Sequence, residues 1–452
     1  MLGRRRRALV GLVMVAGFVV GSVAGPAAFA DGIGDVPGPA TATVGAVRIR
    51  PVTSGDLASV YEVSDLSTTT AQAVQAAAAS VGASTTLTTG FSIGMTAVRR
   101  GGGYVQQASG PSGLWQYPMG VSAFDVNVLP AIMGDRVASA VGQGTVVMGQ
   151  TTAELRGAQA GDVIDLVSAN GPIVSFAIGL VATDAEVGGT EIVMSLDQAA
   201  ALVPISYSRV LVYGTFDRTA LDLAFAARGL VDGERFAGAR IRVRRSWSPM
   251  DPDSGLGLAR TKVLLGEFDY SLNSSGVSID ADWRATHIVH VNFTDIGVRS
   301  NCNVAIVADL QAALTEVAQA GLAGAIDLAN TNSYGGCYTP RFNRVTGNLG
   351  FLSRHTWGQP IDMNTVSNAQ GAVPKMDCNV VRIFRKHGFA WGGNFLSSDG
   401  MHFEWVGEPR DQLAYPSKYC PNQPTGFVQS IIATALSSAA TRAAFFSDDG
   451  WR

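Results

Sequence analysis

Every histidine and cysteine of this chain lies beyond residue 286, and that distribution most constrains how the chain is organised. Residues 46–246 contain neither residue type and are rich in Val, Ala, Gly and Thr. Together with carboxylates, His and Cys side chains supply most protein ligands for zinc and many general bases. We therefore expect the chemistry of the chain in its C-terminal part and another role for the front part.

A basic and then apolar segment opens the chain and predicts export. Residues 4–7 are all arginine, residues 8–24 carry no charge, and residues 28–30 read Ala-Phe-Ala. This order is typical of a secretory signal peptide over residues 1–30, with an uncleaved membrane anchor as the alternative. The arginine pair at 6–7 also fits a twin-arginine signal, so the export route stays open. We expect the rest of the chain to be secreted or held in the cell envelope.

The composition excludes several classes of protein. With 47% hydrophobic and 15% charged residues, the chain can bury a core and is not disordered overall. Only one apolar run approaches the length of a membrane span, which excludes a multispan membrane protein. Removing residues 1–30 leaves 33 − 4 = 29 basic against 36 acidic residues, a net charge of −7. Such a chain lacks the clustered positive charge of a nucleic-acid binder.

One basic stripe interrupts this acidic balance. Arg240, Arg242 and Arg244 alternate with the apolar residues Ile241 and Val243. Alternation with a period of two is typical of a β-strand. We expect an edge strand whose cationic face is solvated, as edge strands often are.

The four cysteines predict two disulfides in an oxidising compartment. No two of them are spaced as a Cys-x-x-Cys pair, so a cysteine-based zinc site is not expected. Three pairings are compatible with the sequence. We favour Cys337 with Cys378, and Cys302 with Cys420.

The sequence divides into six segments. We expect a signal peptide at 1–30, a flexible tether at 31–45, a strand-rich α+β domain at 46–248, a linker at 249–256, a second α+β domain at 257–420 and a tail at 421–452. In the front domain, hydrophobic patterns predict strands at 46–50, 145–148, 163–167, 173–181, 191–195 and 209–213. Helices are expected at 71–80, 152–157 and 219–229, the second behind a capping box at Thr151 and Glu154.

Part of the front domain resembles a known family. Residues 149–166 and 176–182 are similar to the extracytoplasmic domain of MacB-type ABC permeases, in which a helix, a Gly-Asp turn and two strands follow one another. The region offers no cluster of titratable side chains. We therefore expect residues 46–246 to bind, position or regulate, for instance through a membrane or envelope protein partner.

The most informative residues form two short stretches. His355 is followed seven residues later by Asp362, and His402 lies in a second stretch with Asp399 and Glu404. A turn at Gly358 would fold Asp362, on a following strand, back towards His355. Two histidines and one carboxylate leave a fourth tetrahedral position for water, as catalytic zinc requires.

These stretches resemble the zinc peptidases of the D-Ala-D-Ala carboxypeptidase and L-Ala-D-Glu endopeptidase family. That family is marked by Ser-x-His-x-x-Gly-x-x-x-Asp and a later acid-x-x-His. The first motif is matched by Ser353, His355, Gly358 and Asp362, and the second by Asp399 and His402. The similarity extends over residues 257–415. The chain departs from the family pattern at Gln359 and Pro360, but neither of these positions is a metal ligand in the family.

The resemblance assigns roles to individual residues. It implies that His355, Asp362 and His402 bind Zn²⁺ and that Asp399 is the general base. Arg341 matches the arginine that stabilises an oxyanion or holds a substrate carboxylate. Ser353 and Trp391 are expected to shape the substrate cleft. Glu404 shares a strand face with His402 and either orients that ligand or is itself the base; we prefer Asp399.

The expected fold of this C-terminal domain is a set of helices on a small antiparallel sheet, with the zinc in the cleft of the sheet. Helices are expected at 303–320 and 379–387, and strands at 285–292 and 325–329. The resemblance implies an enzyme that hydrolyses a peptide bond in peptidoglycan stem peptides, either the terminal D-Ala bond or the L-Ala–D-Glu bond. The pattern around Cys337 and His402 slightly favours the second bond. The alternative is an inactive, zinc-containing cell-wall binding or sensing protein.

Overall fold

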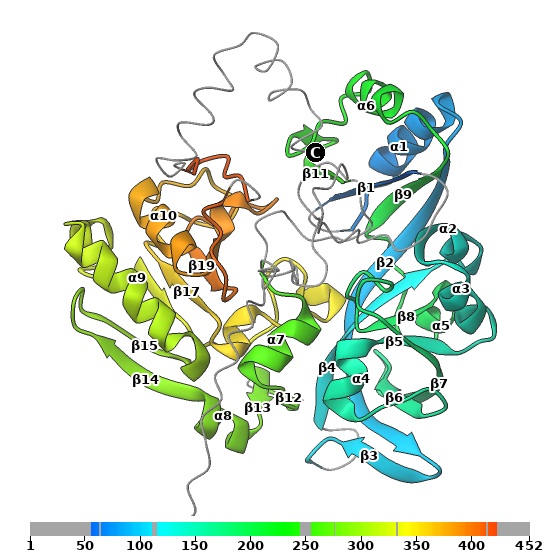
Figure 1. Ribbon diagram of the computed structural model, residues 1–452, viewed down its shortest axis with the longest axis horizontal. Coiled ribbons are helices and arrows are strands. Elements are labelled where there is room, and N and C mark those ends of the chain that lie inside the picture. The colour runs from blue at the N-terminus through cyan, green and yellow to red at the C-terminus, as the bar shows by residue number, and fades with distance from the viewer. Residues whose placement is uncertain are drawn as a thin grey trace, which may run out of the picture.

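The computed structural model describes residues 56–62, 65–110, 115–244, 255–274, 276–330, 333–412 and 415–422. They form a strand-rich front part and a C-terminal part beside it (Figure 1). Helices and strands alternate in both parts, which confirms the expected α+β class. Within the described ranges, no helix combines the length and hydrophobicity of a membrane span. The expected signal peptide and tether, and the tail beyond residue 422, lie outside the described residues.

One large sheet builds the front part. Its spatial order is β10 (Arg235–Phe236), β11 (Ala239–Arg244), β1 (Asp56–Glu62), β9 (Arg209–Gly214), β2 (Ser84–Arg100), β6 (Val163–Val167), β7 (Ile173–Ala182), β5 (Val146–Gly149), β8 (Ile192–Ser195) and β4 (Trp115–Phe124). The short β3 (Gly103–Gln107) pairs with the end of β2. Because β4 also pairs with β2, the strands from β2 to β4 close into a ring around a hydrophobic core.

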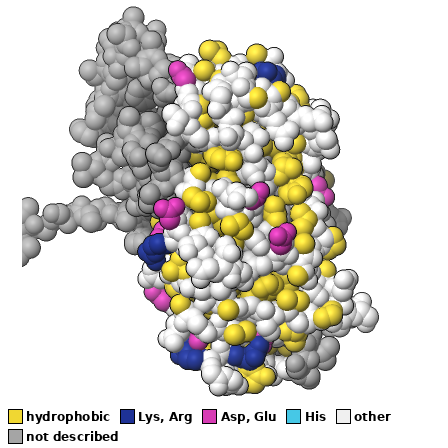
Figure 2. All heavy atoms as spheres, turned by 90° about the vertical axis from the view of Figure 1, so that its right-hand side faces the viewer, with side chains coloured by type: hydrophobic (Ala, Val, Ile, Leu, Met, Phe, Trp, Pro, Cys, Tyr) yellow, Lys and Arg dark blue, Asp and Glu magenta, His cyan; other side chains and the backbone are white. Residues whose placement is uncertain are grey.

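Helices cover the faces of this sheet that the ring does not enclose. They are α1 (Thr68–Ser80), α2 (Leu129–Met133), α3 (Asp135–Gly142), α4 (Gln150–Arg156), α5 (Leu196–Ala200) and α6 (Arg218–Ala226). Val74 of α1 and Leu221 of α6 are both fully buried in the core beneath β1 and β9. On the outer face of the front part, hydrophobic side chains are scattered and charged ones are few (Figure 2).

The strands expected after residue 140 are confirmed as β5, β6, β7, β8 and β9. The strand expected at 46–50 lies outside the described residues. The capping box expected at the start of α4 is wrong. This helix begins at Gln150 behind Gly149, and the hydroxyl of Thr151 donates to the carboxylate of Asp184 instead. A carboxylate more than thirty residues further along the chain therefore takes the place of the expected capping box.

The C-terminal part packs helices on small antiparallel sheets, as expected. Its elements are α7 (Leu258–Leu265), β12 (Tyr270–Asn273), β13 (Gly276–Ile279), α8 (Ala281–His287), β14 (Ile288–Phe293), β15 (Val298–Asn303), α9 (Val307–Gln319), β16 (Tyr334–Gly336), β17 (Pro360–Met363), α10 (Cys378–Lys386), β18 (Phe389–Trp391) and β19 (His402–Trp405). The order β16-β17-β19-β18 forms a four-stranded sheet, and β14 pairs with β15. Phe384 of α10 and Phe403 of β19 stack at 4.6 Å in a core without solvent exposure.

Two expectations for this part need correction. No strand forms at 325–329, because residues Ala323–Ala325 make a 3-10 turn directly after α9. The strand expected at 285–292 starts three residues later, as β14, because α8 continues to His287. Asp280 caps that helix by accepting from the Trp283 N–H at 2.7 Å. The helices expected at 303–320 and 379–387 are confirmed as α9 and α10.

The four cysteines form two disulfides, but the expected pairing is wrong. Cys302 is joined to Cys337, and Cys378 to Cys420. The end of β15 runs beside the chain that follows β16, where the Tyr338 N–H donates to the Asn301 carbonyl at 3.0 Å. Each disulfide therefore fastens a loop to a neighbouring element, whereas the expected pairs would have flanked the motif region and tied the two ends of the domain to each other.

A buried charge cluster joins the two parts. Lys262 of α7 is fully buried, and its Nζ lies 2.7 Å from Glu191 Oε1 and 3.2 Å from Glu267 Oε1. Arg156 of α4 also contacts Glu267. Burial lowers the pKa of Lys262, although both glutamates act to raise it. Strands β12 and β13 extend the large sheet beyond β4 as well, so hydrogen bonds and ion pairs both hold the C-terminal part against the front part.

We expect Lys262→Met to lower the free energy of unfolding by about 3–5 kcal/mol, because it leaves buried carboxylates short of a cation. Urea denaturation of the full chain measures this change. Lys386→Met is the matched control. Lys386 pairs with Glu316 on the surface with 56% of its side chain exposed, so its loss should cost less than about 1 kcal/mol. Equal effects of the two substitutions would contradict a role of Lys262 in joining the parts.

Candidate metal centre

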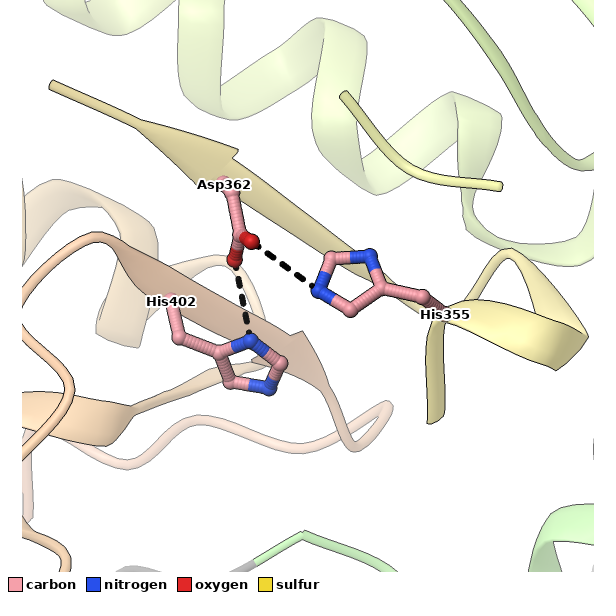
Figure 3. A group of neighbouring side chains, drawn as sticks. All are labelled: His355, Asp362 and His402. Atoms are coloured by element: carbon pink, nitrogen blue, oxygen red, sulfur yellow. Dashed lines mark hydrogen bonds and ion pairs between the residues drawn. The ribbon is translucent and has the colours of Figure 1, made fainter. Parts of the chain in front are cut away.

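His355, Asp362 and His402 meet at one point from three elements (Figure 3). His355 lies in the 3-10 helix Arg354–Trp357, Asp362 on β17 and His402 on β19. The antiparallel register places Asp362 directly opposite His402. Opposite residues of an antiparallel pair point to the same face, with Cβ atoms about 4.5–5.5 Å apart. Strand pairing alone therefore brings two of these three side chains together.

Gly358 brings in the third side chain. Its φ of 64° lies in the left-handed region, and a Cβ at this position would stand 2.8 Å from the backbone nitrogen of Asn303. Glycine alone fits this turn, which leads from the 3-10 helix into β17, as the sequence predicted. The following Pro360 is the first residue of β17, where a proline costs least.

The three side chains form a compact set of candidate ligands. His355 Nε2 lies 3.1 Å from Asp362 Oδ2, and His402 Nδ1 lies 3.0 Å from Asp362 Oδ1. One nitrogen or oxygen atom from each residue lies within 4.8 Å of the others. Two imidazoles and one carboxylate at such spacing are the three protein ligands of many catalytic zinc sites.

The remaining nitrogen of each imidazole is held by an acceptor. His355 Nδ1 lies 2.8 Å from the carbonyl oxygen of Cys337. His402 Nε2 lies 3.1 Å from Glu404 Oε2, whose side chain is almost entirely buried. An acceptor at the far nitrogen fixes the ring orientation, and the near nitrogen becomes a lone-pair donor when a metal cation displaces its proton. Both rings are thus oriented to bind a cation beside Asp362.

The charges around the site favour such a cation. Burial acts to raise the pKa of Asp362, but the neighbouring His355 and His402 outweigh it and hold that pKa well below its ordinary range. Burial likewise acts to lower the pKa of His402. Its hydrogen bonds to Asp362 and Glu404 outweigh this effect and raise the pKa of His402 to about 10. Paired carboxylates therefore stabilise positive charge at this position.

Asp399 stands at the edge of this group, three residues before His402. The His402 N–H donates to the Asp399 carbonyl at 3.1 Å, and the Asp399 N–H donates to the Gly392 carbonyl at 2.7 Å. Asp399 Oδ1 is buried and has no hydrogen-bond partner. Burial raises the pKa of Asp399. Asp399 Oδ1 can therefore accept a hydrogen bond, and then a proton, from a donor such as a water molecule.

Arg341 is close enough to Asp362 and Asp399 for their charges to act on it. Its main chain is fixed, because its carbonyl accepts from the Ser353 N–H at 2.9 Å and from the hydroxyl of Thr356 at 3.1 Å. Burial lowers the pKa of Arg341, whereas the carboxylates of Asp362 and Asp399 act to raise it. The structure thus brings Arg341 into the electrostatic field of the candidate ligands.

Ser353 and Trp391 support the site from behind rather than forming an open surface. Ser353 is buried and caps the 3-10 helix, accepting from the His355 N–H at 3.3 Å. Trp391 has no exposed surface, and its indole N–H donates to the Gly400 carbonyl at 3.0 Å. Ser353 thus holds the 3-10 helix of His355, and Trp391 holds the turn between Asp399 and His402. Their expected part in shaping the substrate cleft stays a prediction.

Two groups that hold the candidate metal ligands in place were not predicted from the sequence. One is the Cys337 carbonyl, which is a backbone group and carries no signal in the residue type. The other is Gln359, a departure from the family motif, whose side chain donates to the Trp405 carbonyl at 2.7 Å in a fully buried position. It anchors the start of β17 to the end of β19, next to the paired Asp362 and His402.

The donor set fits a zinc ion. It offers two imidazole nitrogens and one carboxylate, both imidazoles are oriented by acceptors, and a buried carboxylate oxygen of Asp399 lacks a partner. Three protein ligands leave one position for water or substrate.

Comparison with known proteins agrees with this geometry. Residues 346–405 match the model of a family described as D-alanyl-D-alanine carboxypeptidase, and this segment contains all three candidate ligands and Asp399. No curated protein matches the chain. The similarity of the front domain to MacB-type permeases finds no support. The resemblance of the C-terminal part to the D-Ala-D-Ala carboxypeptidase family of metallopeptidases is confirmed over residues 346–405.

Proposed function

We propose that this chain is an exported zinc metallopeptidase that hydrolyses a peptide bond in peptidoglycan stem peptides. The observation that carries the proposal is the convergence of His355, Asp362 and His402 inside the segment that matches the carboxypeptidase family. A bound zinc ion supplies Lewis-acid polarisation of a carbonyl and lowers the pKa of water. Two disulfides suit the oxidising environment outside the cytoplasm.

Asp399 is the proposed general base. Its unpartnered oxygen Oδ1 accepts a proton from the attacking water, and its carboxyl group then donates that proton to the leaving amine. The raised pKa of Asp399 supports this exchange, because it makes the carboxylate a better acceptor of the proton from the attacking water. The backbone hydrogen bonds to Gly392 and His402 hold Asp399 beside the ligands.

Glu404 is the proposed positioning residue for His402 and not the base. Its Oε2 contacts His402 Nε2, the nitrogen that points away from Asp362. Its other oxygen, Oε1, lies 3.6 Å from Arg354 Nε. That oxygen, like Asp399 Oδ1, is buried without a hydrogen-bond partner, so it is the contact of Oε2 with His402 Nε2 that supports Glu404 as the group that orients the imidazole and increases its basicity as a ligand.

Arg341 is the proposed binding group for negative charge. It lies close enough to Asp362 and Asp399 for their charges to act on its pKa. A guanidinium there either stabilises the developing oxyanion or holds the terminal carboxylate of the substrate. The presence of both Arg341 and Asp399 favours an active enzyme over an inactive wall-binding protein, because binding alone needs neither an unpartnered base nor this arginine.

The family match supports release of the terminal D-Ala, and the L-Ala–D-Glu bond is the alternative within the same proposal.

We expect the full chain with zinc to cleave defined muropeptides and to lose that activity when a chelator is added. Mass spectrometry of the products identifies the bond. Loss of one terminal Ala indicates a carboxypeptidase, and a cut after the first L-Ala an endopeptidase. Absence of cleavage despite one bound zinc per chain would favour the wall-binding alternative.

We expect Asp399→Asn to reduce kcat by about 10²–10⁴-fold, because the amide cannot take a proton. Zinc content, measured by atomic absorption, should stay at one per chain since Asp399 is not a ligand. Asp282→Asn on the exposed surface of α8 is the matched control and should keep wild-type activity. Activity of the Asp399 variant within a few-fold of wild type would rule out Asp399 as the base.

We expect Glu404→Gln to weaken zinc binding about 10–100-fold, the usual effect of removing a carboxylate that orients a histidine ligand. Competition with a fluorescent chelator measures the Kd. With saturating zinc, this variant should recover much more activity than Asp399→Asn. The reverse result, a normal Kd and no activity at any zinc concentration, would assign the base to Glu404.

A further inference from the structure

The basic stripe of the front domain is not the solvated edge that its sequence predicts. Strand β11 pairs with β1 on one side and β10 on the other. Ile241 and Val243 face the core beneath α1 and α6. Arg242 and Arg244, on the opposite face, are only 9% and 4% exposed. A stripe that only kept the edge soluble would leave these long side chains in water.

These arginines face the C-terminal part across a cavity of about 340 Å³. One wall is β11 with Asp232 and Gly233 from the turn before β10, and the other is the chain after β18 with the segment 416–419. Among the described residues that line it, the charged ones are Arg240, Arg242, Arg244, Lys418 and Asp232. The described lining is therefore mostly basic, although Lys418 also pairs with Glu234 at 3.9 Å. Asp232 is engaged with Arg242 at 3.0 Å.

The cavity adjoins the proposed catalytic centre. Its C-terminal wall includes Phe395, whose ring centroid lies 5.9 Å from that of His402. It also includes Ser398, the residue before Asp399. An extended peptide advances about 3.3–3.6 Å per residue, so a substrate lying over the metal ligands reaches this wall within a few residues.

We propose that this cavity binds a free carboxylate of the peptide substrate, so that the front domain contributes part of the substrate site. The proposal rests on the peptidase function proposed above and specifies its substrate as a peptide with a carboxylate away from the cleaved bond. Guanidinium groups bind carboxylates through paired N–H donors, and several of them on one wall favour an anion. A volume of this size holds a small polar group rather than a polymer.

The test compares two stem peptides that differ only in one group. In one peptide the glutamic acid carries its free carboxylate, and in the other that carboxylate is amidated. We expect the full-length zinc enzyme to have a KM about tenfold lower for the carboxylate form, the effect of one charge-assisted contact. In Arg240→Gln the ratio of the two KM values should fall towards one.

Two further variants repeat and control this test. Lys418→Gln changes the opposite wall, and with 60% of the side chain exposed it poses little risk to folding. It should reduce the same ratio. Arg235→Gln is the matched control: this exposed arginine on β10 donates to the Gly238 carbonyl and does not line the cavity. It should keep the wild-type ratio. Wild-type ratios in both Arg240→Gln and Lys418→Gln would overturn the proposal.

A binding measurement separates this proposal from the peptidase function. Fluorescence anisotropy gives the Kd of each labelled peptide for the full chain that carries Asp399→Asn, with and without Arg240→Gln. A carboxylate preference that depends on Arg240 supports the cavity site even if the wild-type chain cleaves neither peptide, in which case only the peptidase function fails. Equal Kd values for both peptides would overturn the cavity site whatever the activity.

Discussion

The pairing of β17 with β19 is the interaction on which the metal centre depends. Asp362 stands opposite His402 in that register, and a slip of β19 by one residue would turn His402 to the opposite face of the sheet from Asp362. Gln359 secures the register from its end, because its side chain and backbone both bond to Trp405. The family motif therefore encodes a strand register as much as a set of ligands.

The two parts of the chain are joined more firmly than a linker would require. Glu191 from the front part and Lys262 from the C-terminal part share a buried ion pair, and β12 adds to the edge of the front sheet at β4. Buried charges cost desolvation energy that only close partners offset. Such a junction fixes one geometry, which a shared cavity between the parts requires.

The sequence predicted the grouping of His355, Asp362 and His402, because most of its signal is local. His355, Gly358 and Asp362 lie within eight residues, and their types limit the possible chemistry. The disulfide pairing was not predictable, since it depends on the path of the chain between β15 and the segment after β16. For β11 the period of two correctly predicted a strand. The prediction that its cationic face is solvated was wrong, because the chain that covers this face lies about 150 residues further along the sequence.

The distribution of charge suggests how a substrate would be oriented. Three carboxylates, those of Asp362, Asp399 and Glu404, lie at the candidate metal centre, whereas the described lining of the neighbouring cavity is mostly basic. Arg341 beside the first group can hold the terminal carboxylate of a peptide, whereas the second group attracts a carboxylate further from the cleaved bond. Complementary charge of this kind determines the register of a bound ligand more than its affinity. A peptide anchored through its carboxylate in the cavity would therefore present a neutral amide bond, rather than an anion, to the metal ligands and Asp399.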